Sequence, residues 1–268
     1  MIAYRYDGSF DGMLSCIFTS FARHEDPQLI DTFDQPQAAL IPVRTIPTEP
    51  DKARRVERGI RGKIGEEEWE MVRDGFLCEL ENREVILTRF VRLLFRYGRR
   101  AATNYADPTV DALWKALRHM RQEAHLLKGF VRFSDYDGVL VSVISPKNQV
   151  LPILAEHFSV RFPGEQFMIY DQNHKTGFIH TATERQFIEV ESLTLPKAGA
   201  EEKAFRSLWR GYFQHMAIKE RENPLCQRTH LALRYRPWMT EFTEDEDTAA
   251  QLPEEKTAAF LPEFTKFR

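Results

Sequence analysis

The hydrophobic pattern of the chain changes its period at Gly129, and this change limits the folds that the chain can form. Upstream, apolar residues recur every three or four positions, as in helices, and downstream they form short strand-like runs. The expected helices span residues 66–81, 85–97, 108–127, 150–162 and 201–220. The expected strands span residues 130–133, 139–144, 166–170, 177–181 and 186–193. This order favours an α+β fold with a mainly antiparallel sheet covered by helices.

The N-terminus shows a separate local pattern. Residues 2–6 are expected to form a short strand, followed by a turn and a helix with Ser9 at its N-cap. The segment lacks the basic and apolar regions of a signal peptide, and no apolar run in the chain approaches the roughly 18 residues that span a bilayer. We therefore expect a cytoplasmic protein with no membrane partner.

The composition excludes several classes of site. The 268 residues are 43 % hydrophobic and 29 % charged, which is typical of a globular protein. The three cysteines are odd in number and far apart, so they predict neither a disulfide framework nor a thiolate metal site. We accordingly expect no metal and no cofactor.

Charge is unevenly distributed along the chain, although the net charge is only -3. Residues 85–132 contain ten Lys or Arg and three Asp or Glu, which predicts a basic face that an anionic polymer would meet. Residues 241–255 contain seven acidic residues and no basic one. This second stretch predicts a solvated, partly disordered end, with shielding of the basic surface as an alternative.

The helix expected at 85–97 carries arginines on a face separate from its apolar side. These arginines, and the one just beyond the helix, are Arg89, Arg92, Arg96 and Arg99. No acidic residue lies three or four positions away to pair with them within the helix. They form either an ordinary solvated face or a surface that binds a polyanion such as DNA, whose phosphates arginine contacts in a salt-dependent way.

The next helix contains the polar run HMRQEAHLLK at residues 119–128. His119 and Glu123 are one turn apart and could share a metal, or a histidine and Glu123 could transfer a proton. Glu123 and His125 are therefore the catalytic candidates. Arg121 and His125 lie on the same broad side as Lys128, which favours binding of a negative group, and a structural role for these residues is the alternative.

The C-terminal part contains an amphipathic helix and then a segment rich in arginine and aromatic residues. The helix at 201–220 is expected to bury Phe205, Leu208, Trp209, Tyr212 and Met216. Pro224 interrupts helical continuation after residue 221. The segment 234–238, RYRPW, combines planar cations with aromatic rings, a pattern suited to stacking unpaired bases and contacting phosphates. Alternatively, its rings cover the core and its arginines pair with the acidic tail.

Four stretches spread over almost the whole chain carry a specific combination of residues. They are YRYDGSFDGMLSCIF at 4–18, RQEAHLLKGFVRF at 121–133, HFSVRFPGEQFMIYD at 157–171 and LWRGYFQHMAIKERENPLCQRTHLALRYRPWMTEF at 208–242. In these stretches the chain resembles a bacterial family described as DNA-metabolism or DNA-repair proteins, whose defining part is a domain of unknown function. The matching positions include Tyr6, Asp7, Gly8, Arg121, Glu123, His125, Arg132, Phe133, Arg161, Phe162, Pro163, Trp209, Arg221, Asn223, Pro224, Gln227, Arg234, Tyr235 and Trp238. Ala232 departs from the family pattern, where proline is expected.

The resemblance implies a functional link with DNA. Family members accompany a radical-SAM protein assigned to DNA modification or repair, and a related domain is fused to uracil-DNA glycosylase-like proteins. Both associations leave the chemistry to another polypeptide or domain, so no catalytic role comes with the matching residues. The resemblance also implies a family domain at residues 85–243, preceded by a strand-helix and helical region at 1–84 and followed by an acidic tail at 244–268.

Three hypotheses follow. The first is a DNA-repair or DNA-metabolism protein that binds DNA, single-stranded or damaged, as the partner of a radical-SAM enzyme. The second is a DNA-processing enzyme, a hydrolase or a glycosylase-like protein, that uses His125 and Glu123. The third is a docking module that holds a protein partner without touching DNA. The residues expected to contact DNA are Arg89, Arg92, Arg96, Arg99, Arg121, His125, Arg132, Arg221, Asn223, Gln227, Arg234 and Trp238.

Overall fold

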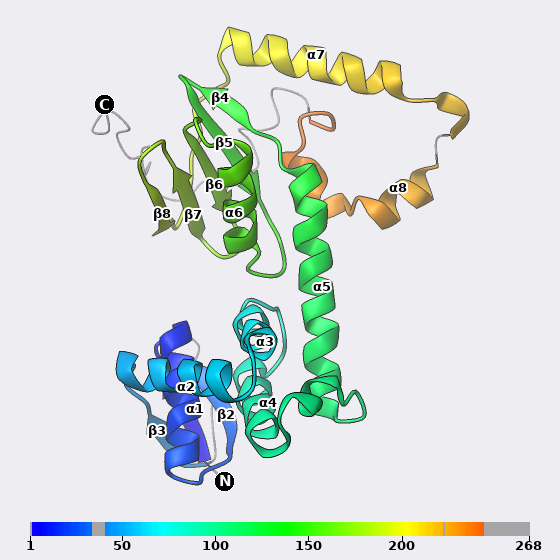
Figure 1. Cartoon of the computed structure of the whole chain (residues 1–268). Coiled ribbons are helices and arrows are strands. Elements are labelled where there is room, and N and C mark those ends of the chain that lie inside the picture. The colour runs from blue at the N-terminus through cyan, green and yellow to red at the C-terminus, as the bar shows by residue number, and fades with distance from the viewer. Residues whose placement is uncertain (1, 34–40, 222, 244–268) are drawn as a thin grey trace. The chain divides into compact units, whose positions relative to one another are not determined.

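The chain divides into two compact units, Met1–Arg121 and Gln122–Arg268, each with its own sheet (Figure 1). The structure is a computed structural model, and it describes residues 2–33, 41–221 and 223–243. The division falls within α5 (Pro108–Phe130). No helix of these described stretches is long and apolar enough to cross a membrane.

The first unit is built on a parallel sheet of three strands. They are β1 (Ile2–Tyr6), β2 (Pro27–Thr32) and β3 (Val43–Thr45), in the order β2-β1-β3. The central β1 carries the fully buried Tyr4 and Tyr6. The expected strand, turn and helix at the N-terminus are confirmed, because Ser9 Oγ accepts a hydrogen bond from Gly12 N at the start of α1 (Phe10–Ala22).

Helices complete the first unit. They are α1, α2 (Pro50–Lys63), α3 (Glu66–Phe76), α4 (Arg83–Tyr97) and the short η1 (Arg99–Thr103), followed by the first part of α5. The helices expected at 66–81 and 85–97 are thus present with shifted ends. Gly98 ends α4 with φ 71°, a left-handed conformation that glycine adopts without steric cost.

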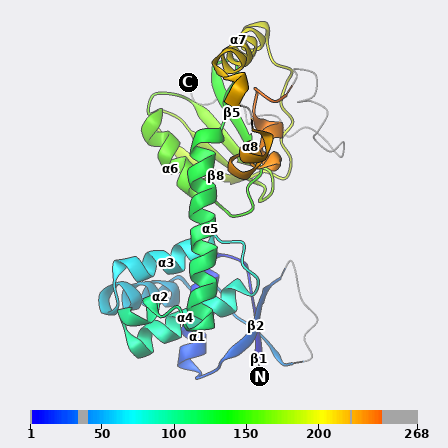
Figure 2. The ribbon, with the colours of Figure 1, turned by 90° about the vertical axis from the view of Figure 1, so that its right-hand side faces the viewer.

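The second unit is built on a mixed sheet of five strands. They are β4 (Ser134–Tyr136), β5 (Val139–Ile144), β6 (Phe167–Asp171), β7 (Thr176–His180) and β8 (Arg185–Glu189), which are adjacent in chain order. Helix α6 (Leu151–Arg161) lies along one face of the sheet (Figures 1 and 2). An apolar cluster built around Val141, Met168 and Tyr170 forms a core of this unit.

The structure confirms a mixture of helices and strands but not a predominance of antiparallel pairing. Among the described strands, three pairings are antiparallel and three are parallel. The parallel pair β5–β6 arises because α6 carries the chain back across the sheet, and α1 does the same between β1 and β2. The expected hairpin over residues 130–144 has β5 as its second strand, but the strand expected at 130–133 is wrong. The first strand is β4, inside the expected loop, because α5 continues to Phe130.

The described chain ends with four helical segments. They are α7 (Ala200–Met216), η2 (Lys219–Arg221), α8 (Pro224–His230) and η3 (Leu233–Trp238). The helix expected at 201–220 ends earlier than predicted, at Met216, and Pro224 stands in the first turn of the separate helix α8. Figure 2 shows α7 nearly end-on at the side of the second unit, where it contacts β4. The acidic tail, residues 244–268, lies outside the described residues.

Candidate nucleic-acid interface

Three of the arginines predicted along α4 contact neutral groups. Arg89 Nη2 donates to Gln28 Oε1 at 3.1 Å, and Arg92 donates to the backbone carbonyl of Glu25. Arg96 is exposed and stacks over the ring of the next residue at 5.0 Å. No carboxylate pairs with these three guanidinium groups within the described part of the chain. Their positive charge therefore remains uncompensated by ion pairs.

The other two predicted cations of the first unit are paired with carboxylates. Arg99 Nη2 lies 2.8 Å from Glu67 Oε2, and its Nε lies 3.1 Å from Glu68 Oε1. Arg121 Nη2 lies 3.1 Å from Asp74 Oδ2. These carboxylates lie on α3, so the spacing of residues within a single helix does not reveal the pairs. The predicted arginine stripe is thus divided into paired and unpaired members.

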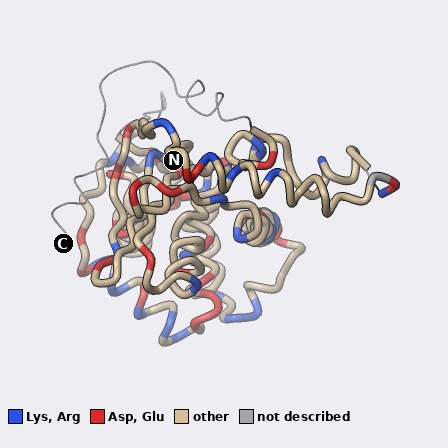
Figure 3. Tube along the Cα trace, turned by 90° about the horizontal axis from the view of Figure 1, so that it is seen from above, with Lys and Arg blue, Asp and Glu red and all other residues tan. Residues whose placement is uncertain are grey.

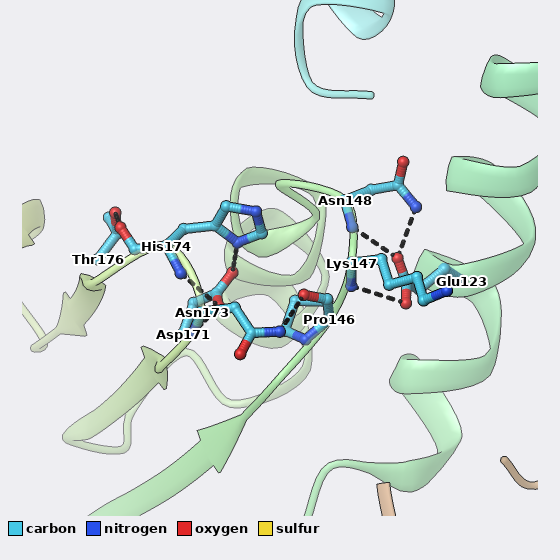
Figure 4. A network of polar contacts seen from close by, with 8 residues as sticks. All are labelled: Glu123, Pro146, Lys147, Asn148, Asp171, Asn173, His174 and Thr176. Atoms are coloured by element: carbon cyan, nitrogen blue, oxygen red, sulfur yellow. Dashed lines mark hydrogen bonds and ion pairs between the residues drawn. The ribbon is translucent and has the colours of Figure 1, made fainter. Parts of the chain in front are cut away.

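In the second unit, Glu123 is a buried acceptor, with 3 % of its surface exposed. Its carboxylate accepts hydrogen bonds from the backbone N–H groups of Lys147 and Asn148 at 3.0 and 2.8 Å, and from Asn148 Nδ2 at 2.6 Å (Figure 4). It also accepts from Arg234 Nη2 at 2.8 Å and from the Tyr235 hydroxyl at 2.7 Å. Five donors, from η3 and the loop after β5, thus converge on one carboxylate of α5.

This environment determines the charge of Glu123. Burial by itself raises the pKa of the carboxyl group, but the N–H groups of Asn148 and Lys147 outweigh it, so the pKa of Glu123 is lowered. The group is therefore an ionised acceptor whose lone pairs are already used. His125 is exposed, and no hydrogen bond joins it to Glu123 in the described structure. The geometry favours a positioning role for Glu123, and catalysis by the two residues stays a prediction.

The loop after β5 is held from its other side by the β6–β7 turn (Figure 4). Asn173 Nδ2 donates to the carbonyl of Pro146 at 2.7 Å. The Asp171 carboxylate accepts from the N–H groups of Asn173 and His174 and lies 2.7 Å from His174 Nδ1. These contacts order the ends of two neighbouring parallel strands. The described residues contain no cluster of three or more metal-ligating side chains.

Side chains of the segment 234–238 pack and form hydrogen bonds within the protein. Tyr235 is buried, and burial, followed by its hydrogen bond to Glu123, raises its pKa. Trp238 packs against the apolar cluster of the sheet, and its Nε1 donates to Ser145 Oγ at 3.0 Å. The guanidinium of Arg234 lies 4.6 Å from the centroid of the Tyr235 ring. The alternative interpretation, that these rings cover the core, agrees with this geometry.

Arg132 connects the end of α5 to α7 through Glu241. Its Nη2 and Nε lie 2.7 and 3.2 Å from the two carboxylate oxygens of Glu241, whose side chain is almost fully buried. Trp209 Nε1 donates to the same carboxylate at 3.1 Å, and the Arg132 guanidinium lies 5.3 Å from the indole centroid. The carboxylate thus holds a cation and an indole side by side at the protein surface.

An open groove of about 650 Å³ runs between α7 and the end of α5. Its lining consists of Gly129, Arg132, Phe133, Glu202, Phe205, Arg206, Leu208, Trp209, Tyr212 and Thr240. The buried pair Glu202–Arg206 ties α7 to β4, because Arg206 Nη2 donates to Ser134 Oγ and Glu202 accepts from Asp135 N. Although burial raises the pKa of Glu202, its hydrogen bonds to Arg206 and Asp135 lower it overall, so this carboxylate is ionised. The pair fixes the N-terminal half of α7.

The outer side of α7 is exposed, which corrects the prediction that this helix buries its apolar residues. Phe205, Leu208, Tyr212 and Met216 are 68, 69, 57 and 63 % exposed, and Trp209 is 38 % exposed. The Trp209 and Tyr212 rings stack at 5.7 Å with an angle of 28°. The apolar stripe of α7 is broader than its contact with β4 and residues 241–243 can cover. We define these five residues as the α7 face.

The remaining predicted residues lie around α8. Asn223 caps this helix, because its Oδ1 accepts from Cys226 N at 3.0 Å. Gln227 is exposed, and its backbone carbonyl accepts from Leu231 N. Arg221 is exposed and has no ion pair within residues 2–33, 41–221 and 223–243. Only Arg221 and Gln227 of these three keep side chains available to a ligand.

The structure therefore distributes the predicted DNA-contacting residues over two units and over different environments. Arg89, Arg92, Arg96, Arg99 and Arg121 belong to the first unit, and the others belong to the second. Sequence reasoning missed the α7 face as a surface. The sequence carries no signal that separates this face from a buried one, since residues 205, 208, 209, 212, 213 and 216 follow the three- and four-residue spacing of an ordinary amphipathic helix.

Comparison with known proteins identifies a family without an assigned activity. Residues 81–241 match the family model described as a domain of unknown function, DUF4130. The match extends from the start of α4 to Glu241, so it includes the Glu123 network and the α7 face. No curated protein matches the chain.

Proposed function

The chain belongs to the DUF4130 family, and we propose that it binds unpaired DNA strands through the groove and the α7 face. The observation that carries this proposal is the exposure of stacked aromatic rings on α7 next to arginines. Bases of a single strand stack on such rings with a contribution of about 1–3 kcal/mol per base. Unpaired bases have accessible faces, whereas bases in a duplex stack on each other, so the surface favours single strands.

The charge of the same region supports binding of a phosphate chain. Residues 203–236 contain eight Lys or Arg and two Asp or Glu. Figure 3 shows Lys and Arg positions distributed along the segment from α7 to α8. Arg221 and Arg228 are exposed there. Cations beside stacking rings are the usual composition of a single-strand-binding surface, in which the cations contact phosphates and the rings contact bases.

The biological setting that we propose is DNA repair or DNA metabolism in the cytoplasm, with a radical-SAM enzyme as partner. This part rests on the resemblance of the four sequence stretches to DNA-repair and DNA-metabolism proteins. The ionised and fully hydrogen-bonded Glu123 supports it indirectly, because it favours a binding protein over a hydrolase that would use this residue. The reacting groups would then belong to the partner.

A titration with a fluorescent single-stranded oligonucleotide tests the proposal. We expect the affinity to fall as salt rises, and to fall about 5- to 150-fold in Tyr212→Ala, which loses one stacking ring. Phe187→Ala on β8 is the matched control, since Phe187 is also an exposed ring of the second unit but lies outside the groove. Equal affinity of Tyr212→Ala and the wild-type protein, or no binding of single-stranded DNA, would refute the proposal.

Protein docking is a second candidate function, favoured by the aliphatic part of the same surface. Leu208 and Met216 are more than 60 % exposed, and Leu225 on α8 is 75 % exposed. Aliphatic groups gain little from contact with a phosphate chain but are common in protein interfaces. Leu208→Ser should therefore weaken a complex with a purified radical-SAM partner more than it weakens DNA binding. If Leu208→Ser weakens DNA binding more than it weakens the protein complex, the ligand of the α7 face is DNA.

A further inference from the structure

A second pocket of the second unit gathers cations on α5 and α6, away from the groove. It has a volume of about 390 Å³ and is open to solvent. Its lining consists of Lys128, Ile153, Glu156, His157, Val160 and Arg161. The five α6 residues recur at three- and four-residue intervals and therefore share one side of the helix. Lys128 enters from α5 and closes the cluster.

The cations of this pocket lack anionic partners among the residues that the structure describes. Neither Lys128 nor Arg161 forms an ion pair with a described carboxylate, although Glu156 lies in the same pocket. Arg161 instead lies 5.6 Å from the centroid of the Phe162 ring. With His157 neutral the four ionisable side chains carry one net positive charge, and with His157 protonated they carry two. Like charges held together in this way are stabilised by a bound anion.

The pKa of His157 reflects the positive charge of the pocket. Its pKa is lowered, first by partial burial and then by the positive charges of Lys128 and Arg161. The charged groups that border the ring are Lys128 from α5 and Glu156 and Arg161 from α6. An anion bound between Lys128 and Arg161 would offset their repulsion of a protonated His157. The imidazolium could then donate a hydrogen bond to the anion.

We propose that the Lys128–His157–Arg161 pocket is a phosphate-binding site. The lining offers donors from two basic side chains and an imidazole, and its other members are aliphatic except for Glu156. Without a Phe, Tyr or Trp ring in the lining, the pocket suits a phosphate group rather than a stacked base. The phosphate can belong to a free nucleotide or to a nucleic-acid strand. This site is separate from the α7 face and does not depend on the function proposed for it.

The test follows the His157 imidazole by NMR in the full chain, with His157→Gln to assign its resonance. Inorganic phosphate, a nucleoside monophosphate and a single-stranded oligonucleotide are titrated separately. Binding should shift the resonance and raise the midpoint of its pH titration, because the anion favours the imidazolium. Saturation by the small phosphates indicates a free nucleotide as ligand, and saturation by the oligonucleotide alone indicates a strand phosphate.

Matched variants distinguish phosphate binding in this pocket from non-specific attraction of phosphate to surface cations. Arg161→Gln should weaken binding about tenfold, because a charge-assisted hydrogen bond is lost. Glu156→Gln should strengthen it about two- to threefold by removing the nearby negative charge. Lys175→Gln, at an exposed lysine outside the pocket, should change nothing. A His157 resonance that no phosphate shifts, or a shift that Arg161→Gln leaves unchanged, would overturn the proposal. Tyr212→Ala should retain inorganic-phosphate binding, because Tyr212 lies outside the pocket. The phosphate site can therefore be confirmed even if the α7 face does not bind DNA.

Discussion

The Glu123 network and the region formed by the α7 face and the arginines near it use the same residue types, arginine and aromatic side chains, in opposite ways. Around Glu123, Arg234 and Tyr235 are bound to a buried carboxylate. On α7, Tyr212 is more than half exposed and its ring stacks on Trp209. Both regions lie in the second unit and within the family match, so neither family membership nor composition distinguishes them.

The difference shows that a buried carboxylate decides whether an arginine is structural. The cost of burying Glu123 is offset only when each of its lone pairs meets a donor, and Arg234 is one of those donors. Such an arginine has its preferred partner and offers less charge to a ligand. By contrast, the exposed Arg221 and Arg228, near and on α8, form no ion pair with a carboxylate of the described residues. The contrast predicts stability effects in the first region and binding effects in the second.

The largest effect is expected from Glu123→Ala. Removing the carboxylate leaves the buried donors of Asn148 and Tyr235, and the partly exposed guanidinium of Arg234, without their acceptor. This should lower the free energy of unfolding by about 3 kcal/mol. Urea unfolding followed by the amide NMR signals of the second unit measures this change. His125→Ala is the control and should stay within about 0.5 kcal/mol of the wild type, because His125 is exposed. Equal stability of the two variants would remove the contrast between the regions.

A smaller effect should appear in the pH dependence of Glu123→Gln. Since the folded protein lowers the pKa of Glu123 from its ordinary value of 4.5, ionisation stabilises the fold above that pH. This stabilisation is lost as the pH falls through the lowered folded-state pKa. The difference in unfolding free energy between wild type and Glu123→Gln should therefore be largest near neutral pH and shrink below about 4.5. Glu202 is present in both proteins, so its contribution cancels in this comparison. A difference in unfolding free energy that does not change with pH would contradict the lowered pKa of Glu123.

The sequence predicted the local parts of this structure and not the contacts between distant segments. The Ser9 cap, α4 and β5 depend on neighbouring residues, and periodicity or capping chemistry is enough to find them. The parallel β5–β6 pairing depends on the return path through α6, which composition does not show. Glu123 and Tyr235 are 112 positions apart, so their hydrogen bond could not be inferred from spacing.

The α7 face illustrates a different limit. Periodicity identifies the residues that share one side of a helix, and it correctly placed Phe205 and Tyr212 on the apolar side of α7. It does not tell whether another element covers that side. In the structure, Glu202 and Arg206 occupy the contact with β4, and the neighbouring apolar residues remain outside it. The same pattern thus predicts a core or a binding surface, and only the packing distinguishes them.

The smallest expected effect concerns Arg221 and Arg228, whose replacement should change the salt dependence of DNA binding more clearly than its strength. Each phosphate contact on a single strand contributes about 0.7 to the slope of log affinity against log salt concentration, so the double Arg→Gln variant should lower that slope by about 1.4. Arg185→Gln on β8 removes an equally exposed charge from the same unit and should lower it much less. If the double variant and Arg185→Gln have the same slope, Arg221 and Arg228 do not contact phosphates, and the contrast with the Glu123 network is then limited to the rings of α7.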